Sequence, residues 1–112
     1  MNTLQSPSIE ELEAHLRQLP GWSLQITVTP DGSTRSELRK SYAFASFAQA
    51  VQFMQQAVPA IDELGHHPCW ENVWRQVHVR LLTWDSGQRA SWLDLELARL
   101  LDSQYTAFAG MA

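Results

Sequence analysis

Apolar residues recur at helical spacing in three stretches of the chain, and each stretch opens with a capping signal. The first runs from Ser8 to Leu19, carries one apolar stripe and ends at Pro20-Gly21. Ser8 with Glu11 fits the capping box, in which a hydroxyl and a carboxylate each satisfy a backbone N–H that the first helical turn leaves unpaired. A 3.6-residue apolar period behind such a cap predicts an amphipathic helix.

The second and third stretches repeat this signature. Ser46 with Gln49 precedes an amphipathic pattern that continues to Ile61, and Gly65 is well placed as its C-terminal cap. Pro59 lies inside the pattern, where we expect it to kink the helix or break one turn. The third helix is predicted to open at Ser91 with Asp94, and its buried face would carry four leucines: Leu93, Leu97, Leu100 and Leu101.

Between the helical stretches, apolar and polar residues alternate as they do in half-buried strands. Residues 22–28 alternate strictly, Pro30 to Ser33 reads as a turn, and residues 38–44 form the returning strand, although Lys40 interrupts its parity. From Trp70 to Trp84 the chain is rich in Trp and Val. A turn near Arg75-Gln76 would divide this run into two strands, while one long strand is the alternative.

The predicted order is helix, strand, strand, helix, strand, strand, helix. Hairpins next to helices favour an α+β fold, with a four-stranded antiparallel sheet and three helices packed on one face. No repeat or linker divides the chain, so we expect residues 1–112 to form a single domain. A domain of 112 residues exposes much surface for its volume, and assembly into a homodimer or larger oligomer would bury more apolar surface.

Composition and charge narrow the classes of partner and compartment. The net charge is -4 and the eight basic residues form no stripe, which argues against binding to nucleic acid. The single cysteine, Cys69, permits no intrachain disulfide, so a cytoplasmic location is expected. We see no signal peptide at the N-terminus and no apolar run long enough to span a bilayer, so no membrane association is predicted.

The adjacent histidines His66 and His67, followed by Pro68, are the main chemical feature, and three interpretations compete. They could belong to a polar connection without chemistry. They could bind zinc together with Cys69, but the spacing lacks paired ligands, and adjacent side chains of an extended segment point in opposite directions. They could also act as general acid and base, since histidine titrates near pH 6.5. Pro68 extends His67 and Gly65 permits a sharp turn, so both rings would sit at a defined corner.

Together with the residues around them, these histidines resemble the sequence motif of the pterin-4a-carbinolamine dehydratase family. The resemblance rests on an acidic residue, the His-His-Pro run, an aromatic residue, a His or Trp, and a final Asp. The matching positions are Asp62, His66-His67-Pro68, Trp74, Trp84 and Asp94. Trp70 and Asn72-Val73 are also similar to the family, and the predicted order of elements resembles the family fold across nearly the whole chain.

The resemblance implies dehydration of a 4a-hydroxytetrahydropterin to the quinonoid dihydropterin, with no metal and no cofactor. A base would remove the N5 proton and an acid would protonate the leaving 4a-hydroxyl. His66 and His67 are then the catalytic candidates. The resemblance assigns substrate binding to Asp62, Gly65, Trp70, Thr83, Trp84, Asp85 and Asp94.

Three positions depart from the family pattern. Trp84 replaces a third histidine, and its indole cannot exchange a proton near pH 7 and could fill part of the pocket. Cys69 stands where the family usually has an acidic residue, and the loop from Asp85 to Leu93 is slightly longer. These features resemble a divergent branch of pterin dehydratase-like proteins that assist RuBisCO assembly in alpha-carboxysomes.

Two functional hypotheses follow from this sequence. The first is a chaperone-like RuBisCO assembly factor with a degenerate pterin site, associated with the carboxysome and partnered by RuBisCO. It rests on Trp84 and the longer loop. The alternative is an active lyase that binds a pterin such as tetrahydrobiopterin in its 4a-hydroxy form and relies on His66 and His67.

Overall fold

The computed structural model describes residues 5–111 of the chain. The predicted order of helices and strands is confirmed, with one short 3₁₀ helix, η1, added before the last helix. The elements in chain order are α1 (Ile9–Leu16), β1 (Ser23–Val28), β2 (Thr34–Ala43), α2 (Phe47–Leu64), β3 (Cys69–Val73), β4 (Gln76–Leu81), η1 (Trp84–Ser86) and α3 (Trp92–Met111). Within the described residues, no helix is both long and apolar enough to traverse a bilayer.

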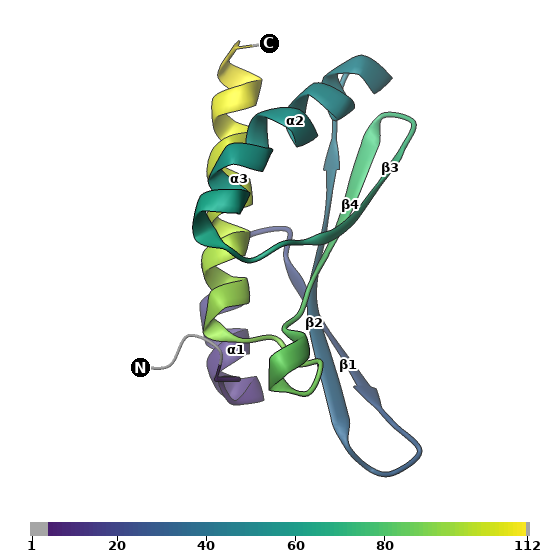
Figure 1. Cartoon of the computed structure of the whole chain (residues 1–112), viewed down its shortest axis with the longest axis vertical. Coiled ribbons are helices and arrows are strands. Elements are labelled where there is room, and N and C mark those ends of the chain that lie inside the picture. The colour runs from purple at the N-terminus through teal and green to yellow at the C-terminus, as the bar shows by residue number, and fades with distance from the viewer. Residues whose placement is uncertain (1–4, 112) are drawn as a thin grey trace.

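The four strands form one antiparallel sheet in the order β1-β2-β4-β3, which confirms the predicted α+β fold. Helix α3 runs along the long axis of the molecule, and the helices lie on one side of the sheet while its other side is uncovered (Figure 1). The turn at Trp74–Arg75 divides the Trp- and Val-rich run into two strands, so the alternative of one long strand is wrong.

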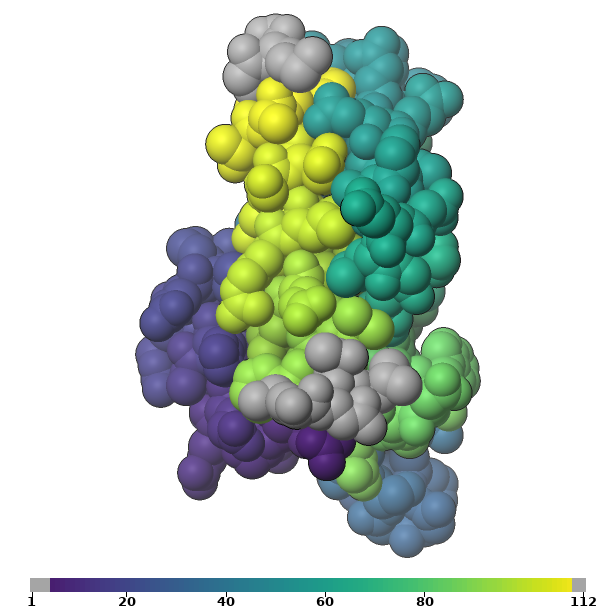
Figure 2. Space-filling view, turned by 60° about the vertical axis from the view of Figure 1, so that its left-hand side comes forward, coloured from purple at the N-terminus to yellow at the C-terminus, as the bar shows by residue number. Residues whose placement is uncertain are grey.

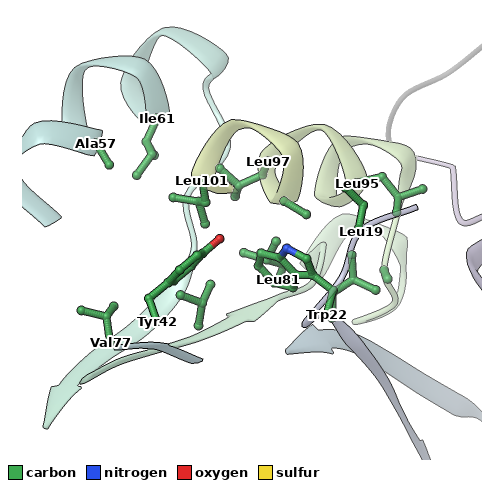
Figure 3. Packing of buried hydrophobic residues seen from close by; sticks show 14 of the residues in the cluster. Leu19, Trp22, Tyr42, Ala57, Ile61, Val77, Leu81, Leu95, Leu97 and Leu101 are labelled. Atoms are coloured by element: carbon green, nitrogen blue, oxygen red, sulfur yellow. The ribbon is translucent and has the colours of Figure 1, made fainter. Parts of the chain in front are cut away.

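The core fills the space between the sheet and helices α2 and α3. Val77, Val79 and Leu81 of β4 are almost fully buried there, and α3 contributes Leu95, Leu97 and Leu101. Figure 3 shows Leu81 of β4 below the α3 leucines, with Tyr42 and Trp22 pointing from the sheet side towards α3. In the space-filling view α3 lies between α2 and the N-terminal part of the chain (Figure 2).

Local signals in the sequence predict most helix ends correctly. The capping box of Ser8 and Glu11 is present in full. At α2 the Ser46 hydroxyl accepts from the Gln49 backbone N–H, whereas the Gln49 side chain accepts from the Ala45 backbone N–H and not from Ser46. Helix α2 continues through Pro59 without a broken turn and ends, as predicted, at Gly65 with φ 74°.

A single carboxylate explains why Lys40 interrupts the apolar parity of β2. The Lys40 ammonium donates to Asp102 Oδ1 at 2.8 Å and to the Pro20 carbonyl at 3.0 Å. Asp102 lies on α3 and also accepts from the Tyr42 hydroxyl at 2.5 Å and from the Trp22 indole N–H at 3.1 Å. A polar residue is therefore tolerated on the helix-facing side of the sheet, because Asp102 pairs with its charge and links α3 to β2.

We predict that Asp102→Asn lowers the free energy of unfolding by about 1–3 kcal/mol, because three donors lose a charged acceptor. Urea denaturation of both proteins measures this. Glu96→Gln makes the same chemical change at an exposed position of the same helix and is the matched control. An equal effect of the two substitutions would show that the Asp102 contacts do not stabilise the fold.

Tyr42 makes the stability depend on pH at the alkaline end. Burial, aided by the hydrogen bond to Asp102, raises the pKa of the Tyr42 hydroxyl above its usual value. The raised pKa contributes stability that is fully present below about pH 10, the usual pKa of tyrosine, and is lost as the pH rises further. We expect the alkaline fall of the unfolding free energy to be shallower in Tyr42→Phe, by up to about 1.4 kcal/mol per pH unit. Parallel alkaline slopes in the two proteins would contradict this.

Candidate functional site

A cavity of about 580 Å³ opens at the end of the sheet where β3 begins and β4 ends. Two loops and the first turn of α3 form its walls, and a volume of this size is within the usual range of small-molecule sites. The residues that line it are Gly65, His66, His67, Pro68, Cys69, Leu82, Thr83, Trp84, Asp85 and Leu93.

The corner that carries the two histidines has a local cause. Gly65 ends α2 in the left-handed conformation, and its N–H bonds back to the carbonyls of Ile61 and Asp62. Pro68 then keeps the preceding residue extended, and the chain enters β3 at Cys69. His66 and His67 therefore lie side by side, just after the end of α2, in the lining of the cavity.

His66 is held by a buried carboxylate. Its Nε2 lies 2.5 Å from Asp94 Oδ1, and Asp94 has no exposed side-chain surface. Asp94 Oδ2 accepts from the Thr83 hydroxyl and from the Ser91 backbone N–H, each at 2.8 Å. Burying a carboxylate is costly unless its oxygens are hydrogen-bonded, and here both are. The same bonds also cap α3, because Ser91 precedes the first residue of that helix.

His67 has the same kind of partner in a more open setting. Its Nε2 lies 2.9 Å from Asp62 Oδ1, and each of the two side chains is 64% exposed. Asp62 is in the last turn of α2, so this contact joins the helix end to the corner that follows it. Because water competes with an exposed pair of this kind, the His67 ring exchanges its partner more easily than His66 does.

These contacts determine which ring nitrogen carries a proton. An ionised carboxylate can only accept a hydrogen bond, so Nε2 of each histidine is the donor when it faces its aspartate. In the neutral ring the other nitrogen, Nδ1, is then the acceptor. The cavity thus has two imidazoles, one oriented by a buried carboxylate and one in contact with solvent, which is an arrangement suited to moving protons.

Trp84 stands in the cavity wall and does not plug it. The residue is 71% exposed. It is also the first residue of the one-turn helix η1, which Gly87 ends with φ 70°. The loop after it folds back on the sheet, because Arg89 pairs with Thr83 in an isolated bridge. This pairing holds the loop beside the cavity without filling it.

The structure places the residues singled out in the sequence in three groups. Six of them line the cavity: Gly65, His66, His67, Thr83, Trp84 and Asp85. Asp62 and Asp94 each contact one of the histidines, as partners of the rings. Trp70 is not among the lining residues; it packs, half-buried, against the core. The catalytic and binding roles of all these residues stay predictions.

Sequence reasoning did not single out Ser91, Leu82 and Leu93 as part of this site. The sequence did predict that Ser91 and Asp94 begin a helix together. That cap belongs to a buried group of hydrogen bonds that also includes Thr83, but the contact with Thr83 is tertiary and the sequence does not show it. Leu82 and Leu93 carry no chemical signal of their own. Across residues 5–111, no three His, Cys, Asp or Glu side chains gather into a group that could hold a metal ion.

Comparison with known proteins identifies relatives along most of the chain. Residues 5–104 match the family model described as pterin 4 alpha carbinolamine dehydratase. A curated protein of Opitutus terrae, named "Putative pterin-4-alpha-carbinolamine dehydratase", is 38% identical over 80% of this chain and 82% of its own length. A protein of the same name from a Bradyrhizobium species is 36% identical over 92% of this chain and 95% of its own.

Two solved structures are similar to this fold. A transcriptional coactivator/pterin dehydratase from Brucella melitensis has 32% sequence identity and a TM-score of 0.73, over 89% of this chain and 98% of that one. A pterin dehydratase-like protein described as a RuBisCO assembly factor in the alpha-carboxysome has 25% identity and a TM-score of 0.48, over 79% and 90% of the two chains.

We predict that Asp94→Asn changes the tautomer of His66. The donors at the Oδ2 position require an oxygen, so the new amide NH₂ would face His66 and donate to it. The neutral ring should then carry its proton on Nδ1. Long-range ¹H–¹⁵N NMR spectra of the imidazoles report this change directly. Asp62→Asn is the control, because Asp62 contacts His67 and its substitution should leave the His66 tautomer unchanged. An unchanged His66 tautomer in Asp94→Asn would contradict the assignment.

Proposed function

Because this chain belongs to the pterin-4a-carbinolamine dehydratase family, we propose that it converts a 4a-hydroxytetrahydropterin to the quinonoid dihydropterin and water. The observation that carries the proposal is the open cavity with two carboxylate-partnered histidines in its wall. A degenerate site would be expected to lose either the cavity or the arrangement of the rings. This chain retains both.

The proposed chemistry divides two proton transfers between the histidines. His66, whose Nε2–H is directed at Asp94, accepts the N5 proton of the substrate through Nδ1. Electrons of the N5–H bond form the C4a=N5 double bond while the C4a–O bond breaks. His67 acts in its protonated form, with Nε2–H facing Asp62 and a second proton on Nδ1, and it gives the Nδ1 proton to the departing hydroxyl, which leaves as water. The exposed ring then regains a proton from solvent.

The two aspartates would act as positioning residues in this mechanism. Asp94 holds the His66 tautomer that leaves Nδ1 free to accept, much as a buried carboxylate orients the histidine of a hydrolase triad. Asp62 orients His67 through its Nε2–H, by a weaker, exposed contact that leaves the Nδ1 proton free to be donated. Thr83 does not contact His66 itself, but its hydroxyl donates to Asp94 and so helps to hold that carboxylate in place.

The role of RuBisCO assembly factor stays a prediction from the sequence. It rests on Trp84, which could fill part of the pocket and which replaces a proton-transferring histidine, and on the longer loop. With Trp84 largely exposed beside a cavity of about 580 Å³, the first part of that motivation is weaker. The second part remains, because an indole cannot supply a third proton donor of histidine type.

Turnover of a freshly generated 4a-hydroxytetrahydropterin, followed by the absorbance of the quinonoid product, tests the proposal. We expect wild-type activity above the uncatalysed rate and a loss in kcat/KM of roughly 10²-fold in His66→Ala and in His67→Ala, since general acid–base catalysis contributes at least that much. The control is His78→Gln, a histidine on β4 that is bonded to Ser41 and lies outside this cavity.

Two outcomes would contradict the proposal. Wild-type turnover that survives both histidine substitutions would show that these rings are not the proton carriers. An inactive wild type whose Trp84→His variant is active would show that the site is degenerate, as the assembly-factor hypothesis holds. In that case, recovery of RuBisCO with the purified protein becomes the decisive measurement for the second hypothesis.

A further inference from the structure

A second cavity adjoins the first across the Trp84 side chain. Its volume is about 300 Å³, and it lies against the uncovered side of the sheet near the β1–β2 hairpin. Cys69, Leu82 and Trp84 line both cavities, so the two are neighbours that share one wall. A substituent of a ligand seated in the first cavity would reach the second by passing Trp84.

The charges in the second cavity favour an anion. Arg35 and Arg80 both line it, whereas Glu37 is its one lining carboxylate. Glu37 is shared, because Arg39 pairs with it at 3.1 Å and Arg80 approaches it at 3.7 Å. The Arg35 side chain is exposed and belongs to none of the ion pairs among the described residues. A local excess of positive charge thus exists on a chain whose net charge is -4.

The remaining walls can hydrogen-bond without adding charge. Gln25 and Thr27 of β1 and Gln88 of the loop contribute amide and hydroxyl groups. The loop is fixed in this position, because the Ser36 backbone N–H donates to the Gln88 carbonyl at 3.1 Å and the Ala90 N–H donates to the Ser36 hydroxyl at 2.9 Å. Guanidinium groups beside neutral polar side chains suit a carboxylate or phosphate group.

We propose that this second cavity is a specificity subsite for an anionic substituent of the pterin, with Arg35 and Arg80 as its anion-binding residues and Trp84 as the wall that the substituent passes. The inference rests on the proposed function, because it requires the pterin ring to occupy the first cavity. It assigns Trp84 a binding role in place of the proton transfer of the histidine it replaces. The substrate class is then a reduced pterin whose side chain ends in a small acidic group.

Binding of stable, oxidised pterins tests the subsite separately from turnover. The probes are 6-hydroxymethylpterin, which is neutral, its phosphate ester, and 6-carboxypterin, with dissociation constants measured by isothermal titration calorimetry. We expect the charged probes to bind wild type roughly tenfold more tightly than the neutral one at low salt, and the advantage to shrink as salt screens the charges. The ester and the carboxylate distinguish a phosphate site from a carboxylate site.

Arg35→Gln should reduce the ratio of the charged to the neutral affinity to below about threefold, whereas Arg35→Lys should keep most of it. Arg17→Gln is the matched control, because it removes the same charge from an exposed position at the end of α1. Thermal unfolding of each variant verifies the fold, and Arg80→Gln replaces Arg35→Gln if the latter does not fold.

The outcomes separate this inference from the function on which it rests. If no pterin binds, the proposed function fails together with the subsite. If the neutral probe binds and the charged probes bind no more tightly, the subsite is wrong and the proposed function stands. A preference that Arg17→Gln reduces as much as Arg35→Gln would arise from the overall charge of the protein and would also overturn the subsite.

Discussion

The buried carboxylate of Asp94 is the constraint on which the site depends. It joins three segments: the corner after α2 through His66, the residues that follow β4 through Thr83, and the start of α3 through Ser91. Desolvating a carboxylate is expensive, so the fold keeps Asp94 buried only while all these partners are in place. The position of the histidine and the start of the helix are therefore fixed by the same set of hydrogen bonds.

Helix α3 carries a second acidic anchor eight residues further along. Asp102 binds Lys40 and Tyr42 of β2 and the indole of Trp22 before β1. One anchor connects the helix to the loops of the site and the other connects it to the sheet. Because a helix transmits position rigidly over a few turns, the orientation of His66 relative to the sheet is set by both contacts.

Local signals predicted much of the fold, because caps and apolar periods act within a few residues. The capping box at Ser8 and the cap at Gly65 needed no knowledge of distant contacts. The same holds for the turn expected near Arg75-Gln76, which the structure has one residue earlier, at Trp74–Arg75. Lys40 could not be explained in this way, since its partner Asp102 is 62 residues away. The His66–Asp94 pair was named in the motif, but burial and the role of Asp94 as a partner of the ring depend on tertiary packing.

The second cavity could not be read from the sequence for the same reason. Arg35 lies on β2 and Arg80 on β4, two strands that are separated in the sequence but adjacent in the sheet. The register pairs Arg39 with Arg80, so Arg35, Arg39 and Arg80 lie on the same face. Seen along the chain, the basic residues are scattered; in the sheet, three of them share a surface. Trp84 stands where this surface meets the cavity of the histidines. In the proposed subsite, Trp84 cannot transfer protons, but it can select the substituent that passes it.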